Sequence, residues 1–215
     1  MTQLQIAARP DLPPEGRPAI FVSYAWGDES SDDARKRTEI VDRLCEALDK
    51  DGWKLIRDKT DMRPGDLISG FMKRIGLADH VIVVLSDKYL RSPYCMTELH
   101  YIYQRSLGEK EDFLRRIIPL ALEDARFGNR RDRLVYAEHW KQEFQSLNED
   151  LRDENRRLLL GREDFADFKA MQQWYPQVSD MLRYMNDVLR PDGFDNIVKD
   201  DFASLRQMLD RKSVV

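Results

Sequence analysis

The sequence predicts an α/β protein in which a parallel sheet is flanked by helices and followed by a helical C-terminal extension. The first observation is a set of short apolar runs without polar alternation, which is typical of strands buried on both faces. The second is that segments with helical periodicity separate these runs, an order that favours a parallel, doubly wound sheet. The expected strands are residues 20–24, 53–57, 81–86 and 116–122, with a fifth strand at 134–140.

The segment 81–98, VIVVLSDKYLRSPYCMTE, is the clearest of these units. Its opening apolar run predicts a central strand. Ser92-Pro93 then marks a helix start, because serine caps free N–H groups and proline fits the first helical position. Glu98 falls in the second turn of this helix, on the same face as Tyr94. A strand that feeds a helix in this way projects side chains at the carboxyl edge of the sheet, where open α/β folds bind ligands.

The remaining elements follow in the same alternation. A helix that ends at Gly52 is followed by the second strand, and a polar loop at 58–66 leads into a helix capped by Asp66. Pro119 lies in the run 116–122 and indicates an edge or an end of the sheet. The two helices carry apolar faces at Ile40, Val41, Leu44, Cys45 and Leu48, and at Leu67, Ile68, Phe71, Met72 and Ile75.

Composition predicts three segments along the chain. Residues 1–17 are rich in proline and predict a flexible leader, and residues 18–150 form the α/β domain. Residues 151–215 predict a helical extension that packs on this domain or on a partner, with apolar side chains at helical spacing such as Met181, Leu182 and Met185.

Bulk properties exclude several classes of protein. The net charge is −4 with both signs interspersed, so nothing predicts attraction to nucleic acid. No apolar run approaches the roughly 20 residues of a membrane span, and the first residues lack the apolar core of a signal peptide. Cys45 and Cys95 fall within expected helices, which indicates reduced thiols and a cytoplasmic location.

Common catalytic and metal motifs are missing from the sequence. His80, His100 and His139 have no paired spacing for a metal ion. The sequence contains neither a phosphate loop nor a dinucleotide fingerprint, and no serine or cysteine sits in a nucleophile elbow. We therefore expect no metal and no bound cofactor.

Three motifs in order resemble the Toll/interleukin-1 receptor (TIR) domain, particularly its bacterial branch. They are IFVSYAWGDE, RDKTDMRPGD and VIVVLSDKYLRSPYCMTEL, and the resemblance covers about residues 18–124. It implies a flavodoxin-like, five-stranded parallel sheet with a mobile loop after the second strand. It also implies one of two functions, either scaffolding through TIR–TIR contacts or cleavage of NAD⁺.

The resemblance also implies site residues. In the hydrolytic branch a glutamate follows the pattern Ser-x-Trp-Cys-x-x-Glu, which Ser92 to Glu98 matches with Tyr94 in place of the tryptophan. Glu98 is therefore the expected catalytic residue, since a single carboxylate is chemically sufficient when the leaving group is a cationic pyridinium. The expected contacts to NAD⁺, a substrate here, are Tyr24, Ala25, Trp26, Asp28, Asp58, Arg63, Gly65, Ser86 and Tyr94.

From the residues alone, each of these positions has an ordinary structural alternative. Glutamates are usually solvated, Tyr24 and Trp26 suit a core or its rim, Pro64-Gly65 suits a surface turn and Ser86 suits a helix cap. Two functions therefore stay open. One is an NAD⁺ nucleosidase of bacterial defence or effector signalling, activated by assembly, that releases nicotinamide and leaves ADP-ribose or a cyclic isomer. The other is a non-catalytic TIR–TIR interaction module, with itself, a sensor domain or another protein as partner. Base exchange on the same scaffold is a third, weaker possibility.

Overall fold

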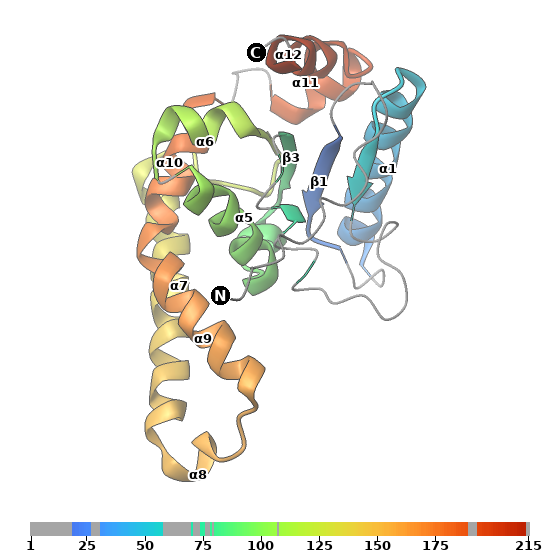
Figure 1. Cartoon of the computed structure of the whole chain (residues 1–215). Coiled ribbons are helices and arrows are strands. Elements are labelled where there is room, and N and C mark those ends of the chain that lie inside the picture. The colour runs from blue at the N-terminus through green and yellow to red at the C-terminus, as the bar shows by residue number, and fades with distance from the viewer. Residues whose placement is uncertain are drawn as a thin grey trace, which may run out of the picture.

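The structure, a computed structural model, contains one parallel sheet of four strands within the part of the chain that it describes (Figure 1). That part comprises residues 19–26, 31–57, 70, 74–75, 78, 80–106, 108–188 and 193–213. The strand order is β2-β1-β3-β4. The strands are β1 (Ile20–Tyr24), β2 (Leu55–Arg57), β3 (His80–Leu85) and β4 (Ile117–Ala121).

Strand β3 is buried on both faces and paired on both sides. Val83 lies opposite Ser23 of β1 and opposite Pro119 of β4, and its side chain is fully buried. The predicted parallel strands are confirmed, with β1 and β3 sharing the interior of the sheet. Strand β4 lies at an edge, where a proline costs no ladder hydrogen bond on its open side.

The prediction of a fifth strand at 134–140 was wrong. These residues lie inside helix α7 (Arg130–Arg152), which Asn129 caps by accepting a hydrogen bond from the backbone N–H of Asp132 at 3.0 Å. Tyr136 and Trp140 are buried one helical turn apart, while Leu134 and Val135 are exposed. The burial therefore follows a helical period rather than the alternation of a strand.

One face of the sheet is covered by two segments from opposite ends of the chain. Helix α1 (Asp32–Lys50) packs there through Val41, Leu44 and Leu48. Helices α11 (Gly193–Lys199) and α12 (Ala203–Ser213) lie beside it (Figure 1). The α12 segment contributes to the same core cluster through Phe202, Leu205 and Leu209. Arg206 and Asp51 form an ion pair between the α12 and α1 segments.

Two helical layers cover the other face. The inner layer consists of α4 (Asp87–Leu90), α5 (Pro93–Arg105) and α6 (Lys110–Arg116). The outer layer consists of α7, α9 (Arg162–Trp174), the 3₁₀ turn η1 (Tyr175–Gln177) and α10 (Val178–Val188). The indole N–H of Trp140 donates to the carbonyl of Leu90 at 2.8 Å, and Trp140 meets Trp174 edge-on with ring centroids 4.8 Å apart. These contacts fix the outer layer to the inner one.

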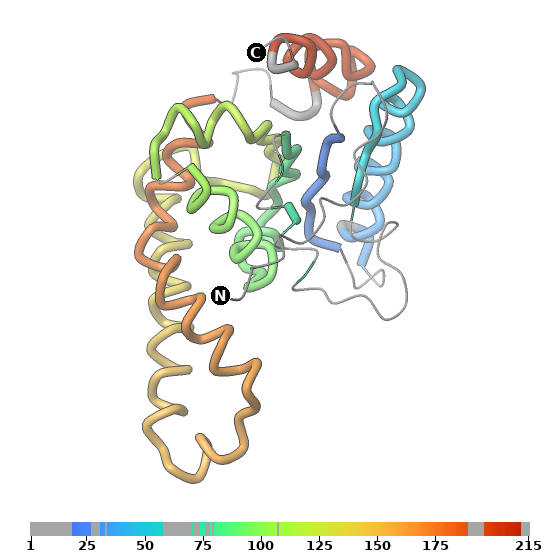
Figure 2. Tube along the Cα trace, viewed as in Figure 1, coloured from blue at the N-terminus to red at the C-terminus, as the bar shows by residue number. Residues whose placement is uncertain are grey.

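Helices α7 and α9 also form a hairpin that extends beyond the sheet, with the short α8 (Glu154–Arg157) at its tip (Figure 2). Leu158 and Leu159 at this tip are 80% and 85% exposed. Helix α7 runs without a break through residue 150, where composition predicted a domain boundary. Helices beyond that point share the core of the sheet, because Trp174, Met181 and Leu182 belong to the same cluster as Val83.

Several sequence predictions lie outside the described residues. They are the leader at 1–17, the loop at 58–66 and most of the helix expected after Asp66. Neither Cys45 nor Cys95 forms a disulfide, and the two residues lie in separate core clusters. Within the described ranges, no helix has the length and apolar character needed to cross a membrane.

Replacement of Trp174 by alanine tests whether the helices after residue 150 fold as one unit with the sheet. Trp174 is 1% exposed, so Trp174→Ala should lower the free energy of unfolding by about 3–5 kcal/mol. Leu159→Ala, at the exposed hairpin tip, is the control and should change it by less than about 0.5 kcal/mol. Urea denaturation followed by circular dichroism measures both. A second transition confined to the helical signal would contradict a common core.

Candidate active site

Three polar side chains from three elements meet at the carboxyl edge of the sheet. The hydroxyl of Ser23, on β1, donates to Oε2 of Glu98, on α5, at 2.6 Å. The same Ser23 oxygen lies 3.0 Å from the phenol oxygen of Tyr89, on α4. All three residues are buried, with exposed fractions of 2%, 7% and 0% for Ser23, Glu98 and Tyr89. A carboxylate is thus held inside the protein by a hydroxyl chain.

Local sequence explains how each residue reaches this point. Side chains alternate along a strand, so Ser23 faces the same side as Phe21, toward the inner helical layer. Ser86 follows the last residue of β3 and caps α4, because its hydroxyl accepts a hydrogen bond from the backbone N–H of Tyr89 at 3.0 Å. Ser92 caps α5 by accepting from the backbone N–H of Cys95 at 3.4 Å, and Pro93 occupies the first turn. Glu98 then follows on the inner face of α5.

Glu98 is buried on a helix that also contributes side chains to the apolar core. Ala25, Cys95 and Leu99 belong to the core cluster on this face of the sheet. An ionised carboxylate in such a place costs several kcal/mol unless hydrogen bonds compensate for lost water. An ionised carboxylate only accepts, so the single hydroxyl proton of Ser23 points to Glu98 and the phenol of Tyr89 donates to Ser23. The chain of donors therefore ends on the carboxylate.

The predicted aromatic contacts divide between the two faces of the sheet. Tyr24 follows Ser23 and points to the opposite side, where it packs with the cluster under α1. The structure therefore does not bring Tyr24 to Glu98. Trp26 and Tyr94 are 47% and 57% exposed and lie just after β1 and in the first turn of α5. Tyr94 is one helical turn from Glu98, so this face of α5 runs from an exposed aromatic to a buried acid.

The other predicted contacts have different positions. Ala25 is 6% exposed and lies in the core cluster on the side of the inner helices. Ser86 is 1% exposed, and its hydroxyl is occupied as the cap of α4. Asp28, Asp58, Arg63 and Gly65 lie outside the described residues, so their contacts to a substrate stay predictions.

Sequence reasoning missed Ser23 and Tyr89. Ser23 is a small polar residue inside the otherwise apolar strand IFVSY. A serine at such a buried position could have indicated a hydrogen-bonding role. Tyr89 gives no such signal, because only the fold brings its hydroxyl to β1. The two residues are 66 positions apart in the chain.

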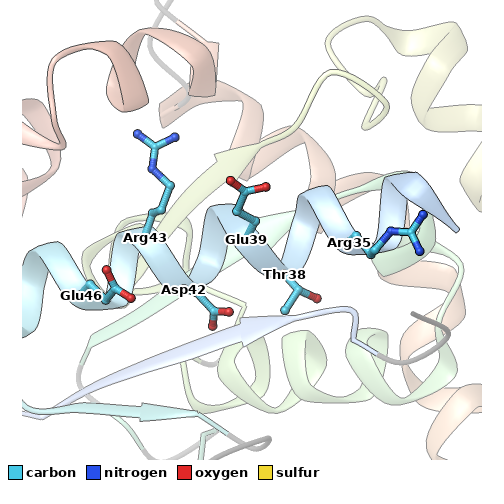
Figure 3. Close-up of a pocket in the computed structure, with 6 residues that line it drawn as sticks. All are labelled: Arg35, Thr38, Glu39, Asp42, Arg43 and Glu46. Carbon is cyan, nitrogen blue, oxygen red and sulfur yellow. The ribbon is translucent and has the colours of Figure 1, made fainter. Parts of the chain in front are cut away.

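A surface pocket elsewhere does not have the character of an active site. It lies along the outer side of α1 and is lined by Arg35, Thr38, Glu39, Asp42, Arg43 and Glu46 (Figure 3). Figure 3 shows that Glu39 and Arg43 project from one side of the helix and Asp42 from the other, so the charges do not converge. Asp42 pairs with Arg57 of β2 at 2.5 Å. These charges belong to a solvated helix face.

The fold and this edge site define a class of protein, a parallel α/β domain with a buried glutamate at the carboxyl edge. A family model described as the TIR domain matches residues 20–159. The chain belongs to the TIR domain family, and the resemblance predicted from its motifs is confirmed.

A solved structure supports the same fold. The chain is similar to the TIR domains in the structure of the activated Roq1 resistosome directly recognizing the pathogen effector XopQ. The identity is 20% and the TM-score is 0.52, over 90% of this chain and 98% of that chain. A search of curated proteins found no match.

His100, two residues after Glu98 on α5, predicts a pH-dependent stability. It is 2% exposed, neither ring nitrogen has a hydrogen-bond partner, and burial lowers its pKa from 6.5 to about 4. Between pH 6.5 and 4 the imidazole is protonated in the unfolded chain but neutral in the folded protein. Stability therefore falls as the pH drops from 6.5 to 4. We expect the free energy of unfolding to fall by about 2 kcal/mol across this window, which is less than the full shift in pKa implies.

The measurement is urea denaturation at several pH values for the wild type and for His100→Phe. The difference between the two proteins isolates His100 from the carboxylates that titrate in the same range. The variant should lose less stability on acidification than the wild type. Parallel pH curves would contradict a neutral, buried imidazole.

Proposed function

We propose that this protein is an NAD⁺ nucleosidase that cleaves the bond between nicotinamide and ribose. The observation that carries the proposal is the buried, hydrogen-bonded carboxylate of Glu98 at the carboxyl edge, in a chain of the TIR family. A buried carboxylate lowers stability relative to an apolar side chain, so its presence at this position needs a reason other than packing. The edge is also where open α/β sheets bind ligands.

The proposed chemistry needs one carboxylate and no proton donor. Nicotinamide leaves NAD⁺ as a neutral base, because the electrons of the broken bond neutralise the pyridinium nitrogen. Positive charge develops on the ribose, and the carboxylate of Glu98 stabilises it from a fixed position of low dielectric. Water then adds to the ribose and loses a proton to give ADP-ribose, or an atom of the adenine attacks to give a cyclic isomer.

Exposed aromatics beside the acid fit the rest of the substrate. Trp26 and Tyr94 are 47% and 57% exposed, and aromatic rings of this kind could stack with nicotinamide or adenine. Ala25, between Tyr24 and Trp26, has a small side chain that would favour close approach of the ribose to the sheet edge. The loop residues Asp58, Arg63 and Gly65, with Asp28, would complete the site from outside the described residues.

A non-catalytic TIR–TIR interaction module is the second candidate. The observation in its favour is that Glu98 is only 7% exposed, so a substrate reaches it only if the edge opens. The two functions combine in one model, in which assembly of several copies completes and opens the site. We assign the activity to the cytoplasm, since neither Cys45 nor Cys95 forms a disulfide, and to bacterial defence or effector signalling.

Glu98→Gln separates the two candidates. The amide keeps an oxygen that accepts from Ser23 but removes the charge, so nicotinamide release should fall about 100- to 1000-fold. The free energy of unfolding should change by less than about 1.5 kcal/mol, since the hydrogen bond remains. Glu111→Gln is the control, because Glu111 is exposed on α6 at the opposite edge of the sheet, and it should leave both quantities unchanged.

The assay is incubation with NAD⁺ and chromatography of nicotinamide, at several protein concentrations. An inactive wild type at every concentration would favour the interaction module. Turnover that survives in Glu98→Gln would locate the chemistry elsewhere.

Assembly predicts a concentration dependence of the activity. If a neighbouring copy completes the site, nicotinamide released per molecule should rise with protein concentration or with a crowding agent. Gly65→Phe, in the loop that the family uses for such contacts, should abolish this rise because a bulky side chain hinders the contact. Sedimentation measured on the same samples checks the association. A specific activity that is flat across concentration would indicate a self-sufficient monomer.

A further inference from the structure

We infer that Ser23 and Tyr89 are positioning residues that fix the carboxylate of Glu98 through a directed chain of hydroxyl donors. The inference deepens the proposed function and rests on it, because Glu98 is the group that acts on the substrate. The two hydroxyl groups lie behind the acid, inside the protein, and act on the substrate only through Glu98.

The first support is geometry. The 2.6 Å distance from Ser23 Oγ to Glu98 Oε2 is short, as expected for an O–H donor to a carboxylate. The 3.0 Å distance between Ser23 Oγ and the phenol of Tyr89 continues the chain. Since Ser23 has one proton and gives it to Glu98, Tyr89 is the donor to Ser23, and each bond polarises the next.

The second support is burial. Ser23 and Tyr89 are 2% and 0% exposed, and both sit where an apolar side chain would pack without the cost of burying a hydroxyl. The chain is otherwise apolar on this side near Ser23, with Phe21 before it in β1 and Ala25 just after the strand. The polar atoms therefore cost stability, and the hydrogen bonds that offset this cost run from Tyr89 to Ser23 and from Ser23 to the acid.

The third support is that Ser23 and Tyr89 both lie on elements that are held rigidly. Ser23 lies in a strand paired on both sides, opposite Val83 on β3. Tyr89 is held by the Ser86 cap, and α4 is fixed from outside by the bond from Trp140 to the Leu90 carbonyl. A carboxylate that is hydrogen-bonded to groups on two rigid elements is already oriented before substrate binds. Orientation of this kind is a large part of catalysis.

The test compares Ser23→Ala, Ser23→Thr and Tyr89→Phe with the wild type. Ser23→Ala should slow turnover roughly ten- to hundredfold with little change in KM, and Tyr89→Phe should slow it less. Ser23→Thr keeps the hydroxyl and should restore most of the turnover. Ser106→Ala and Tyr103→Phe are matched controls: both residues are buried at the far end of α5, with hydroxyl groups near Ile102 and Tyr184. Neither control should change turnover.

A second readout does not depend on activity. The side-chain carboxyl carbon of Glu98 is followed by ¹³C NMR against pH, with its signal identified by its loss in Glu98→Gln. Loss of a donor to the charged form should move the titration midpoint up by about one pH unit in Ser23→Ala and by less in Tyr89→Phe. The Ser106→Ala control should leave the midpoint in place.

The two readouts separate the two proposals. A midpoint that does not move in Ser23→Ala overturns the positioning role, whatever the activity. A midpoint that moves while turnover stays unchanged overturns it as well, since the carboxylate would not need the chain. A wild type that releases no nicotinamide, together with a midpoint that moves, defeats the nucleosidase and retains the hydroxyl chain as the device that holds Glu98.

Discussion

Strand β3 is the constraint on which the rest of the structure depends. It pairs with β1 on one side and β4 on the other, and five of its six residues are buried. A strand of this kind needs an apolar layer against each face, because backbone and side chains alike are removed from water. On one face α1 and the segment around α12 supply that layer, and on the other the inner helices α4, α5 and α6 supply it. The chain thus has to return from its far end to complete the fold.

The helices after residue 150 are therefore part of the same folded unit as the sheet. A hairpin that leaves the body and exposes Leu158 and Leu159 has the outline of an added module. Its base is nevertheless built into the core, where Trp140 and Trp174 pack edge to face and Trp140 holds the end of α4. The same α4 carries Tyr89, so the packing of the outer helices and the arrangement of the site share one short element.

At the site, burial and charge act against each other. Glu98 is buried, and burial strengthens the electrostatic field of a carboxylate and also raises the cost of keeping it ionised. Hydrogen bonding from Ser23 offsets part of that cost, and Trp26 and Tyr94 are exposed just after β1 and in the first turn of α5. The arrangement suits a carboxylate that acts by charge and position rather than by accepting or donating a proton in bulk water.

The sequence by itself determined the parallel strands, the start of α5 at Ser92-Pro93 and the candidacy of Glu98, because these depend on local patterns. Apolar runs, caps and a motif in order are readable over a few neighbouring residues. It failed at 134–140, where an apolar stretch was assigned as a strand although Tyr136 and Trp140 are buried one helical turn apart. Tertiary structure alone decided that Ser23 rather than Tyr24 faces the inner helical layer, and that Tyr89 reaches Ser23. The physical reason is that a hydrogen bond between residues 66 positions apart depends on how β1 and α4 pack. The conformational preferences of neighbouring residues do not determine that packing.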